Sequence, residues 1–390
     1  AEEGAPFRLI KIVGKNRSEI RAELEDKNGQ RLGWIVELSL AGKIQRVQLT
    51  DPGDLDVPPP KDYRGWTDLA KLTEAIRKDT DSPAMAIAIG RGDHIDQVAA
   101  GVREAGKTDA VQPTDPWCIG SIGKPICSTI IGRLIEMGKL RWDTTLGEAL
   151  PDVDMKPSYK AVTLEQIMHH RGGIPQDPGM RKPQVDRIVN GATDPVKIRD
   201  NYARDVLSRD PIAKPGERFA YSNAGYGLLA TIAERTMKKP YEQLVKDMIF
   251  KPLHMTHSYT GVDTLPSARP SGHVRGPGRT WQPTNFTGPM EFMFAGAGGG
   301  LYCSADDLAK FGVMHMKGMR GENGLLKSIT VQRLHQGAPE EAGQSRAYAC
   351  GWGIETPKGL ETMHMHNGSN GTMRAQLSTS RRRALLSLHS

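Results

Sequence analysis

Residues 117–136 read W-C-I-G-S-I-G-K-P-I-C-S-T-I-I-G-R-L-I-E. Apolar residues recur here every three to four positions, which predicts a helix with one face buried in a core: Ile126, Cys127, Ile130, Ile131, Leu134 and Ile135. Pro125 has no backbone N–H and fits only the first turn of a helix, so the regular helix must begin close to it. The stretch therefore predicts a core helix that carries Ser121 and Lys124 at its entrance.

Ser121 and Lys124 are three residues apart at this helix start, so their side chains would share one face. An amine at that distance could take or return the hydroxyl proton, and the serine would then be a competent nucleophile. The unpaired backbone N–H groups of the first turn could stabilise an oxyanion. The pattern S-x-x-K is common by chance, and the alternative interpretation is an ordinary solvated helix start.

Composition sets the broad class of the protein. The chain has 390 residues, of which 38% are hydrophobic and 25% charged, enough for one large domain and a smaller one. No apolar run approaches the roughly 20 residues that cross a bilayer, so no membrane-spanning segment is expected. The opening A-E-E-G fits a periplasmic or secreted protein whose signal peptide has been removed, and it also fits a trimmed chain. The net charge of +7 is interspersed except at Arg381–Arg383, which argues against nucleic-acid binding.

The cysteines and histidines do not form a recognisable metal pattern. The four cysteines are too scattered for a zinc ribbon and too few for a disulfide scaffold, so we expect buried thiols: Cys118, Cys127, Cys303 and Cys350. The pair His169–His170 and the pair His364 and His366 have no organised carboxylate partners. We expect no metal and no cofactor.

The first part of the chain predicts a separate small domain. Between Phe7 and Leu49 apolar and polar residues alternate, and the turns K-N-G-Q and A-G-K separate the runs, as in an antiparallel meander. The proline-rich residues 51–63 are typical of a linker. We therefore expect an N-terminal antiparallel β domain over residues 1–58 and a second domain over 59–390. The first domain carries no clustered acids or nucleophiles and is expected to be structural or to bind a partner.

The second domain predicts both strands and helices. Residues 67–78 have the spacing of an amphipathic helix, and residues 84–90 and 97–102 that of two strands joined by a tight turn. Further helices are expected over 194–208 and 224–237. The glycine run Gly296–Gly300 lacks the lysine and hydroxyl residue of a phosphate-binding loop, and Ser304 and Asp307 resemble a capping box opening the next helix.

A second cluster lies at residues 214–223, K-P-G-E-R-F-A-Y-S-N. A Pro-Gly turn and a short extended piece would deliver Tyr221 and Asn223 just ahead of a helix. A tyrosine whose pKa is lowered by a cation can exchange protons, and an asparagine can hold a lysine amine or a substrate carbonyl. The alternative is a packing aromatic followed by an asparagine cap.

A third cluster lies in an extended run near the end of the chain, where His366, Asn367, Gly368 and Ser369 follow one another. A glycine within a strand allows close approach of a ligand, and the strand edge would then offer the Ser369 N–H to an oxyanion. H-N-G also fits a turn.

In this order, the three clusters resemble the S-x-x-K, Y-x-N and K-T-G motifs of the serine β-lactamase and penicillin-binding family. Residues 163–175 resemble a family segment ending in H-T-S-G-L-P, residues 215–229 resemble P-G-x-x-F-x-Y-S-N-x-G-Y-x-L-L, and residues 297–311 resemble A-G-G-L-x-S-T-A-x-D-L-A-K-F. The Tyr-Ser-Asn centre is similar to the branch that holds class C β-lactamases, D,D-carboxypeptidases, D-aminopeptidases and class VIII carboxylesterases. The resemblance covers residues 66–388.

The resemblance implies an α/β (α+β) β-lactamase/transpeptidase-like fold. An antiparallel sheet would be flanked by helices, with an all-helical lobe inserted at roughly 143–295. It also implies two-step acyl transfer on a small ester, peptide or β-lactam. Ser121 would attack a carbonyl, Lys124 and Tyr221 would move its proton, and the N–H groups of Ser121 and Ser369 would hold the oxyanion. The remaining substrate contacts would come from Asn223, His366, Asn367 and Gly368.

The third motif departs from the family pattern, because His366 stands where that pattern has lysine. An imidazole with a reference pKa of about 6.5 is mostly neutral at pH 7, so we expect weak carboxylate recognition that strengthens below about pH 6.5. This favours carboxylesterase-type activity with slow β-lactam turnover. The sequence leaves open a D,D-peptidase or D-aminopeptidase, a β-lactamase, and a non-enzymatic penicillin-binding sensor.

Overall fold

The structure is a computed structural model, and it describes residues 7–15, 19–26, 31–38, 44–50, 67–176, 182–276, 280–284, 289–338, 346–356 and 361–390. The chain divides into two compact units. One consists of Ala1–Trp66 with Gly276–Thr280, and the other of Thr67–Arg275 with Trp281–Ser390. The expected linker, residues 51–63, lies outside the described residues, so the domain boundary near residue 58 stays a prediction.

The first unit contains the expected meander. Its strands are β1 (Phe7–Lys15), β2 (Glu19–Asp26), β3 (Arg31–Leu38) and β4 (Ile44–Thr50). They lie in the order β1-β2-β3-β4, and each neighbouring pair is antiparallel. This confirms the meander that the alternating sequence predicted.

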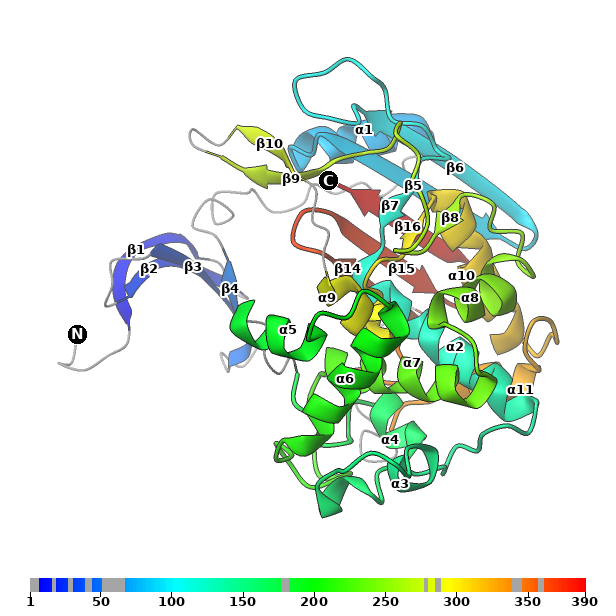
Figure 1. Cartoon of the computed structure of the whole chain (residues 1–390). Coiled ribbons are helices and arrows are strands. Elements are labelled where there is room, and N and C mark those ends of the chain that lie inside the picture. The colour runs from blue at the N-terminus through cyan, green and yellow to red at the C-terminus, as the bar shows by residue number, and fades with distance from the viewer. Residues whose placement is uncertain are drawn as a thin grey trace. The chain divides into compact units, whose positions relative to one another are not determined.

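The second unit is built on a seven-stranded antiparallel sheet with the order β12-β13-β14-β15-β16-β5-β6 (Figure 1). Two strands come from the start of the unit and five from the end of the chain, as expected. Their bounds are β5 (Ala84–Arg91), β6 (His94–Gly101), β12 (Arg346–Tyr348), β13 (Gly353–Glu355), β14 (Met363–Ser369), β15 (Arg374–Thr379) and β16 (Ala384–His389).

Helices cover both faces of the sheet at β5. Successive strand residues point to opposite faces, yet the first five residues of β5 are all buried. The two helices that contact this strand are α1 (Leu69–Asp79) and α10 (Ala305–Met319). At Gly90 an added Cβ would lie 2.4 Å from the Val313 side chain of α10, so only glycine allows this helix to pack so closely.

The predicted core helix is α2 (Gly123–Glu136), which a 3-10 turn, η2 (Gly120–Ile122), precedes. The apolar positions from Ile126 to Leu134 are fully buried, which confirms the predicted face, whereas Ile135 is only partly buried. A three-stranded sheet of β7 (Trp117–Cys118), β11 (Tyr302–Cys303) and β8 (Ser258–Tyr259) leads into the turn. Ser121 therefore enters the helix directly from a buried strand.

Between α2 and α10 the chain forms a mostly helical lobe. Its helices are α3 (Leu146–Ala149), α4 (Leu164–Met168), α5 (Lys182–Val189), α6 (Pro195–Ser208), α7 (Asn223–Met237), α8 (Tyr241–Val245) and α9 (Pro289–Met293), with the single turns η3 (Pro157–Tyr159), η4 (Lys246–Phe250) and η6 (Ala295–Ala297). The prediction that residues 143–295 are all helical is wrong for the last third, which holds β8 and the pair β9 (Gly272–Arg275) and β10 (Trp281–Thr284). Pro266, Pro270 and Pro283 interrupt this segment and exclude a continuous helix.

The expected helix start at Ser304 is confirmed, but the expected capping box is only half formed. Ser304 is the N-cap of α10, and its Oγ accepts a hydrogen bond from the Asp307 N–H at 3.2 Å. The Asp307 carboxylate does not complete a capping box. It accepts instead from the His257 N–H at 2.6 Å and the Ser258 hydroxyl at 2.9 Å, and so holds β8 against the helix.

A buried ion cluster joins three helices of the lobe. The fully buried Arg199 guanidinium of α6 contacts Glu234 of α7 at 2.6 Å and Glu242 of α8 at 2.7 Å. Both carboxylates are also buried. Removal of the cation would leave two buried negative charges without their shared partner.

We expect Arg199→Met to lower the free energy of unfolding by about 3–5 kcal/mol, because breaking a buried ion cluster leaves its remaining charges uncompensated. Urea denaturation measures this loss. The matched control is Arg204→Met in the same helix, where the side chain is 43% exposed and pairs with Asp152 and Asp200. A surface pair contributes about 0–1 kcal/mol, so equal losses in the two variants would contradict the expectation.

Candidate active site

Ser121 lies in the turn that precedes α2, and glycines bring other backbone segments against it. Gly120 has φ of +48°, and an added Cβ there would lie 2.4 Å from the Ser369 nitrogen of β14. At Gly368 an added Cβ would lie 1.9 Å from the Ile119 carbonyl oxygen and 3.0 Å from the Ser121 nitrogen. These glycines allow the edge of β14 to run directly beside the serine turn.

The glycine run that ends at Gly300 also allows close packing against the serine turn. An added Cβ at Gly298 would lie 1.7 Å from the Gly120 carbonyl oxygen, and one at Gly123 would lie 2.1 Å from the Gly298 Cα. Gly298 also has φ of +104°, which residues with a side chain rarely adopt. The run is therefore a close-packing device for the serine turn.

Lys124 is fully buried at the start of α2. Its Nζ donates hydrogen bonds to Ser121 Oγ at 3.0 Å and to Asn223 Oδ1 at 2.6 Å. The same atom lies 4.5 Å from the centre of the Tyr221 ring and 5.7 Å from that of Tyr226. Two polar partners and two aromatic faces thus surround the amine.

Tyr221 approaches Ser121 from the helical lobe. Its hydroxyl donates to Ser121 Oγ at 3.0 Å. Ser121 Oγ therefore contacts a lysine three residues away and a tyrosine 100 residues away in the chain. Either group can accept the serine proton once it has lost its own.

Asn223 is the first residue of α7, and it does not cap this helix. The N-cap is Ser222, whose Oγ accepts from the Gly225 N–H at 2.9 Å. The Asn223 amide oxygen is therefore available for Lys124. This arrangement agrees with the prediction that Asn223 holds the lysine amine and not with the alternative of an asparagine cap.

The third cluster lies on β14, next to the sites above. The His366 side chain is buried and its ring centre lies 6.3 Å from that of Tyr221, whereas the Asn367 side chain is exposed. His366 Nε2 contacts the Tyr348 hydroxyl at 3.0 Å, and its Nδ1 contacts the Asn367 carbonyl oxygen at 2.7 Å. Both ring nitrogens are occupied by protein groups.

The expectation that His366 gains charge below about pH 6.5 is wrong. Burial, with a smaller contribution from the Lys124 cation, lowers the pKa of His366 to about 3. The sequence could not reveal this shift, because it arises from burial in the folded protein and from an amine 242 positions earlier in the chain. A pKa of about 3 keeps His366 neutral at pH 5 and above.

Two residues of the site, His170 and Tyr348, were not predicted from the sequence to belong to it. His170 Nε2 contacts the Tyr348 hydroxyl at 3.2 Å, and its ring centre lies 4.4 Å from that of Tyr221. His170 is part of the segment 163–175 that was quoted for the resemblance. Tyr348 is half-buried at the end of β12, and no motif quoted from the sequence includes it.

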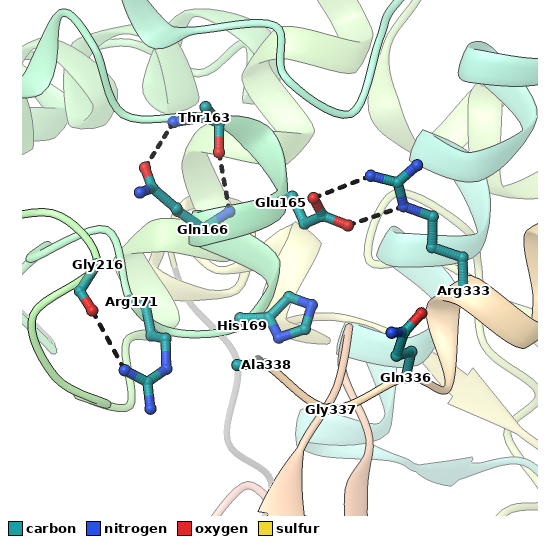
Figure 2. Close-up of a pocket in the computed structure, with 10 residues that line it drawn as sticks. All are labelled: Thr163, Glu165, Gln166, His169, Arg171, Gly216, Arg333, Gln336, Gly337 and Ala338. Carbon is teal, nitrogen blue, oxygen red and sulfur yellow. Dashed lines mark hydrogen bonds and ion pairs between the residues drawn. The ribbon is translucent and has the colours of Figure 1, made fainter. Parts of the chain in front are cut away.

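A separate cavity of about 510 Å³ lies beside residues 163–175 (Figure 2). His169 and Arg171, the two neighbours of His170, line it together with the ion pair of Glu165 and Arg333, whose atoms approach to 2.9 Å. None of the predicted site residues lines this cavity. It is therefore distinct from the surroundings of Ser121.

Within the described residues, the cysteines and histidines considered above do not form a second reactive site or a metal site. All four cysteines are buried and free, and burial raises the pKa of Cys118 and of Cys127 to about 12. Within the described ranges, no group of three or more His, Cys, Asp or Glu side chains could hold a metal ion. No helix in the part of the chain that the structure describes has the length and apolar character to cross a membrane.

Ser121, Lys124 and Tyr221 meet between an antiparallel sheet and a helical lobe. This combination of fold and contacts is typical of the serine β-lactamase and penicillin-binding class. Residues 69–378 match the family described as Beta-lactamase. Penicillin-binding protein 4 of Amycolatopsis lactamdurans is 24% identical over 306 residues, which is 75% of each chain. Protein flp of Staphylococcus aureus is 28% identical over 160 residues, 40% of this chain but only 30% of that relative.

The fold is also found among solved structures. The octameric penicillin-binding protein homologue from Pyrococcus abyssi superposes with a TM-score of 0.67 at 24% identity, over 83% of this chain and 73% of that one. Since the family match spans most of the sequence, this chain belongs to the β-lactamase family, a family of serine hydrolases of the β-lactamase and penicillin-binding-protein type. The predicted fold class is confirmed.

We expect the protein to lose stability as pH falls from 7 to 5. Burial lowers the pKa of His315 and His366 to about 3, and that of His364 and His389 to about 4. Below the unfolded value of about 6.5 the unfolded chain binds protons that the native protein cannot, so stability falls until the native groups also titrate.

Urea denaturation at pH 7, 6 and 5 measures this effect above the range in which carboxylates titrate. We expect the free energy of unfolding to fall by at least about 2 kcal/mol over that interval. The control is His364→Phe, which removes one of the titrating groups and should flatten the dependence. An unchanged stability between pH 7 and pH 5 would show that these histidines are not held neutral.

Proposed function

We propose that the protein is a serine hydrolase that forms an acyl-enzyme on Ser121 and acts best on small uncharged esters. The observation that carries this proposal is the pair of hydrogen bonds on Ser121 Oγ, from Lys124 Nζ and from Tyr221 Oη, each at 3.0 Å. A serine placed between two groups that exchange protons is a nucleophile with both a base and an acid within reach.

The proposed reaction has two steps. In the first, Ser121 Oγ bonds to the substrate carbonyl carbon while its proton passes to the deprotonated member of the pair Lys124 and Tyr221. The tetrahedral intermediate collapses, the bond to the leaving group breaks, and the leaving oxygen or nitrogen takes that proton. In the second step, water gives a proton to the same pair, attacks the acyl carbon and releases the acid, and the proton returns to Ser121.

The N–H groups of Ser121 and Ser369 are proposed to stabilise the negative oxygen of both intermediates. The close contact of Gly120 and Gly368 supports this assignment, because it brings the edge of β14 beside the serine turn. Asn223 is proposed to hold Lys124 in reach of Ser121. Asn367, exposed on β14, and Gly368 are proposed to line the path of the substrate.

The preference for uncharged substrates rests on His366. A lysine at this position would offer a permanent cation to a substrate carboxylate, whereas the His366 imidazole has a pKa of about 3 and no nitrogen free of a protein partner. Carboxylate-bearing β-lactams and peptides are therefore proposed as poor substrates. A periplasmic or secreted location also stays a proposal, and cell fractionation would test it.

Lys124 and Tyr221 are predicted to act as one proton relay, because both contact the same oxygen atom. Lys124→Ala and Tyr221→Phe should each lower the acylation rate by at least about a hundredfold, as is typical for loss of general acid–base catalysis. The double variant should lose little more than the worse single variant, since the second group has no partner left. Burst kinetics with p-nitrophenyl acetate measures acylation. A double loss equal to the product of the single losses would indicate independent roles.

A substrate panel tests the proposed function. The ratio of kcat/KM for p-nitrophenyl butyrate to that for nitrocefin should exceed one and stay constant from pH 5.5 to 8.5, because His366 does not titrate in that range. His366→Lys should shift the ratio toward nitrocefin by about tenfold to a hundredfold, the value of one fixed ionic contact. Circular dichroism checks the fold of the variant.

The other outcomes of this panel identify the alternatives. Faster turnover of nitrocefin than of the ester would make the protein a β-lactamase, and faster turnover of D-alanyl peptides would make it a D-peptidase. Acylation of Ser121 without turnover of any substrate would make it a penicillin-binding sensor.

A further inference from the structure

A continuous chain of hydrogen bonds joins the strand that carries His366 to the segment that carries Tyr221. The Ser222 N–H donates to His170 Nδ1 at 3.1 Å, and His170 Nε2 lies 3.2 Å from the Tyr348 hydroxyl. That hydroxyl lies 3.0 Å from His366 Nε2. His366 Nδ1 ends the chain at the Asn367 carbonyl oxygen, 2.7 Å away.

The two backbone groups at the ends of this hydrogen-bond chain fix the direction of every hydrogen bond in it. A backbone N–H only donates, so His170 Nδ1 must accept, and the proton of neutral His170 is on Nε2. A backbone carbonyl only accepts, so the proton of neutral His366 is on Nδ1. Tyr348 therefore accepts from His170 and donates to His366, and a single tautomer of each imidazole satisfies all the contacts.

His170 is held in this place at a conformational cost. Its φ is +57°, a left-handed backbone conformation that residues other than glycine rarely adopt. Such strain persists where surrounding contacts over-determine the position, and it is frequent at functional sites. Here the backbone carbonyl of His170 also accepts from the Ala220 N–H at 2.8 Å, so both sides of Tyr221 are bonded to one residue.

We propose that His170 and Tyr348 are positioning residues, which align Tyr221 with Ser121 and hold His366 as a neutral hydrogen-bond acceptor. This inference rests on the proposed function of Ser121. The His170 ring packs against the Tyr221 ring at 4.4 Å and against the Tyr348 ring at 4.8 Å. Loss of the Tyr348 hydroxyl would remove the one donor to His366 Nε2 and the acceptor of His170 Nε2 together.

The groups that face His366 explain why the hydrogen-bond chain affects the charge of its imidazole. Lys124 of α2 opposes protonation of His366, and the rings of Tyr221 and Tyr348 lie 6.3 Å and 6.0 Å from the His366 ring. His170 reaches His366 through the Tyr348 hydroxyl. A donor on Nε2 stabilises the neutral imidazole, because protonation would require that donor to turn away. Without the Tyr348 hydroxyl, His366 should take up a proton at a higher pH.

The test compares Tyr348→Phe with Tyr159→Phe. Tyr159 is fully buried and its hydroxyl has no hydrogen-bond partner among the described residues, so the control deletes the same atom outside the hydrogen-bond chain. For p-nitrophenyl butyrate, Tyr348→Phe should lower kcat by about tenfold or more with KM changed less than threefold, because misaligned reacting groups cost rate more than binding. Tyr159→Phe should leave both constants unchanged.

A second readout does not depend on turnover. In protein labelled with 15N-histidine, His170 should show the Nε2–H tautomer and His366 the Nδ1–H tautomer from pH 5 to 8, with signals assigned through His170→Gln and His366→Gln. In Tyr348→Phe the His366 Nε2 signal should shift, because that nitrogen loses its hydrogen bond to the Tyr348 hydroxyl. Absence of ester turnover in the wild type would refute the proposed function alone, and the tautomers would still decide this inference.

The opposite results would overturn the positioning role. These are an Nε2–H or charged His366 in the wild type at pH 7, or a Tyr348→Phe variant whose kcat and histidine signals match those of Tyr159→Phe.

Discussion

The hydrogen bonds that converge on Ser121 Oγ are the constraint on which the rest of the structure depends. Lys124 comes from the helix that follows the serine turn, but Tyr221 comes from the helical lobe, and both must reach one atom at 3.0 Å. Backbone segments can approach the serine turn closely enough only because glycine stands at positions such as Gly120 and Gly298. The buried strand β7 and the core helix α2 fix that turn from both sides.

A buried lysine is costly unless its surroundings replace the water that it loses. Asn223 supplies a short hydrogen bond of 2.6 Å, and the faces of Tyr221 and Tyr226 supply cation–π contacts. Ser222 caps α7 in place of Asn223, which leaves the amide for this purpose. The Y-S-N sequence therefore gives three neighbouring residues three different contacts: Tyr221 with Ser121, Ser222 as the cap of α7, and Asn223 with the Lys124 amine.

The sequence predicted those parts of the fold and site that depend on residues close together in the chain or on recognisable motifs. The helical spacing after Ser121 and the position of Pro125 predicted α2 and its entrance, and the resemblance of three motifs predicted which residues meet. His170 and Tyr348 were missed as site residues because their roles come from contacts 178 positions apart. The sequence predicted a His366 that is mostly neutral at pH 7, but not one that stays neutral well below pH 6.5, because burial, which no short motif encodes, lowers its pKa to about 3.

The central claim is that Ser121 alone is activated, and covalent labelling tests it most directly. The protein is treated with a p-nitrophenyl phosphonate, and intact-mass and peptide mass spectrometry locate the adduct. The account predicts one adduct per chain, on the tryptic peptide that contains Ser121, and none in Ser121→Ala. Labelling of Ser222 or Cys118, or an adduct that persists in Ser121→Ala, would contradict it.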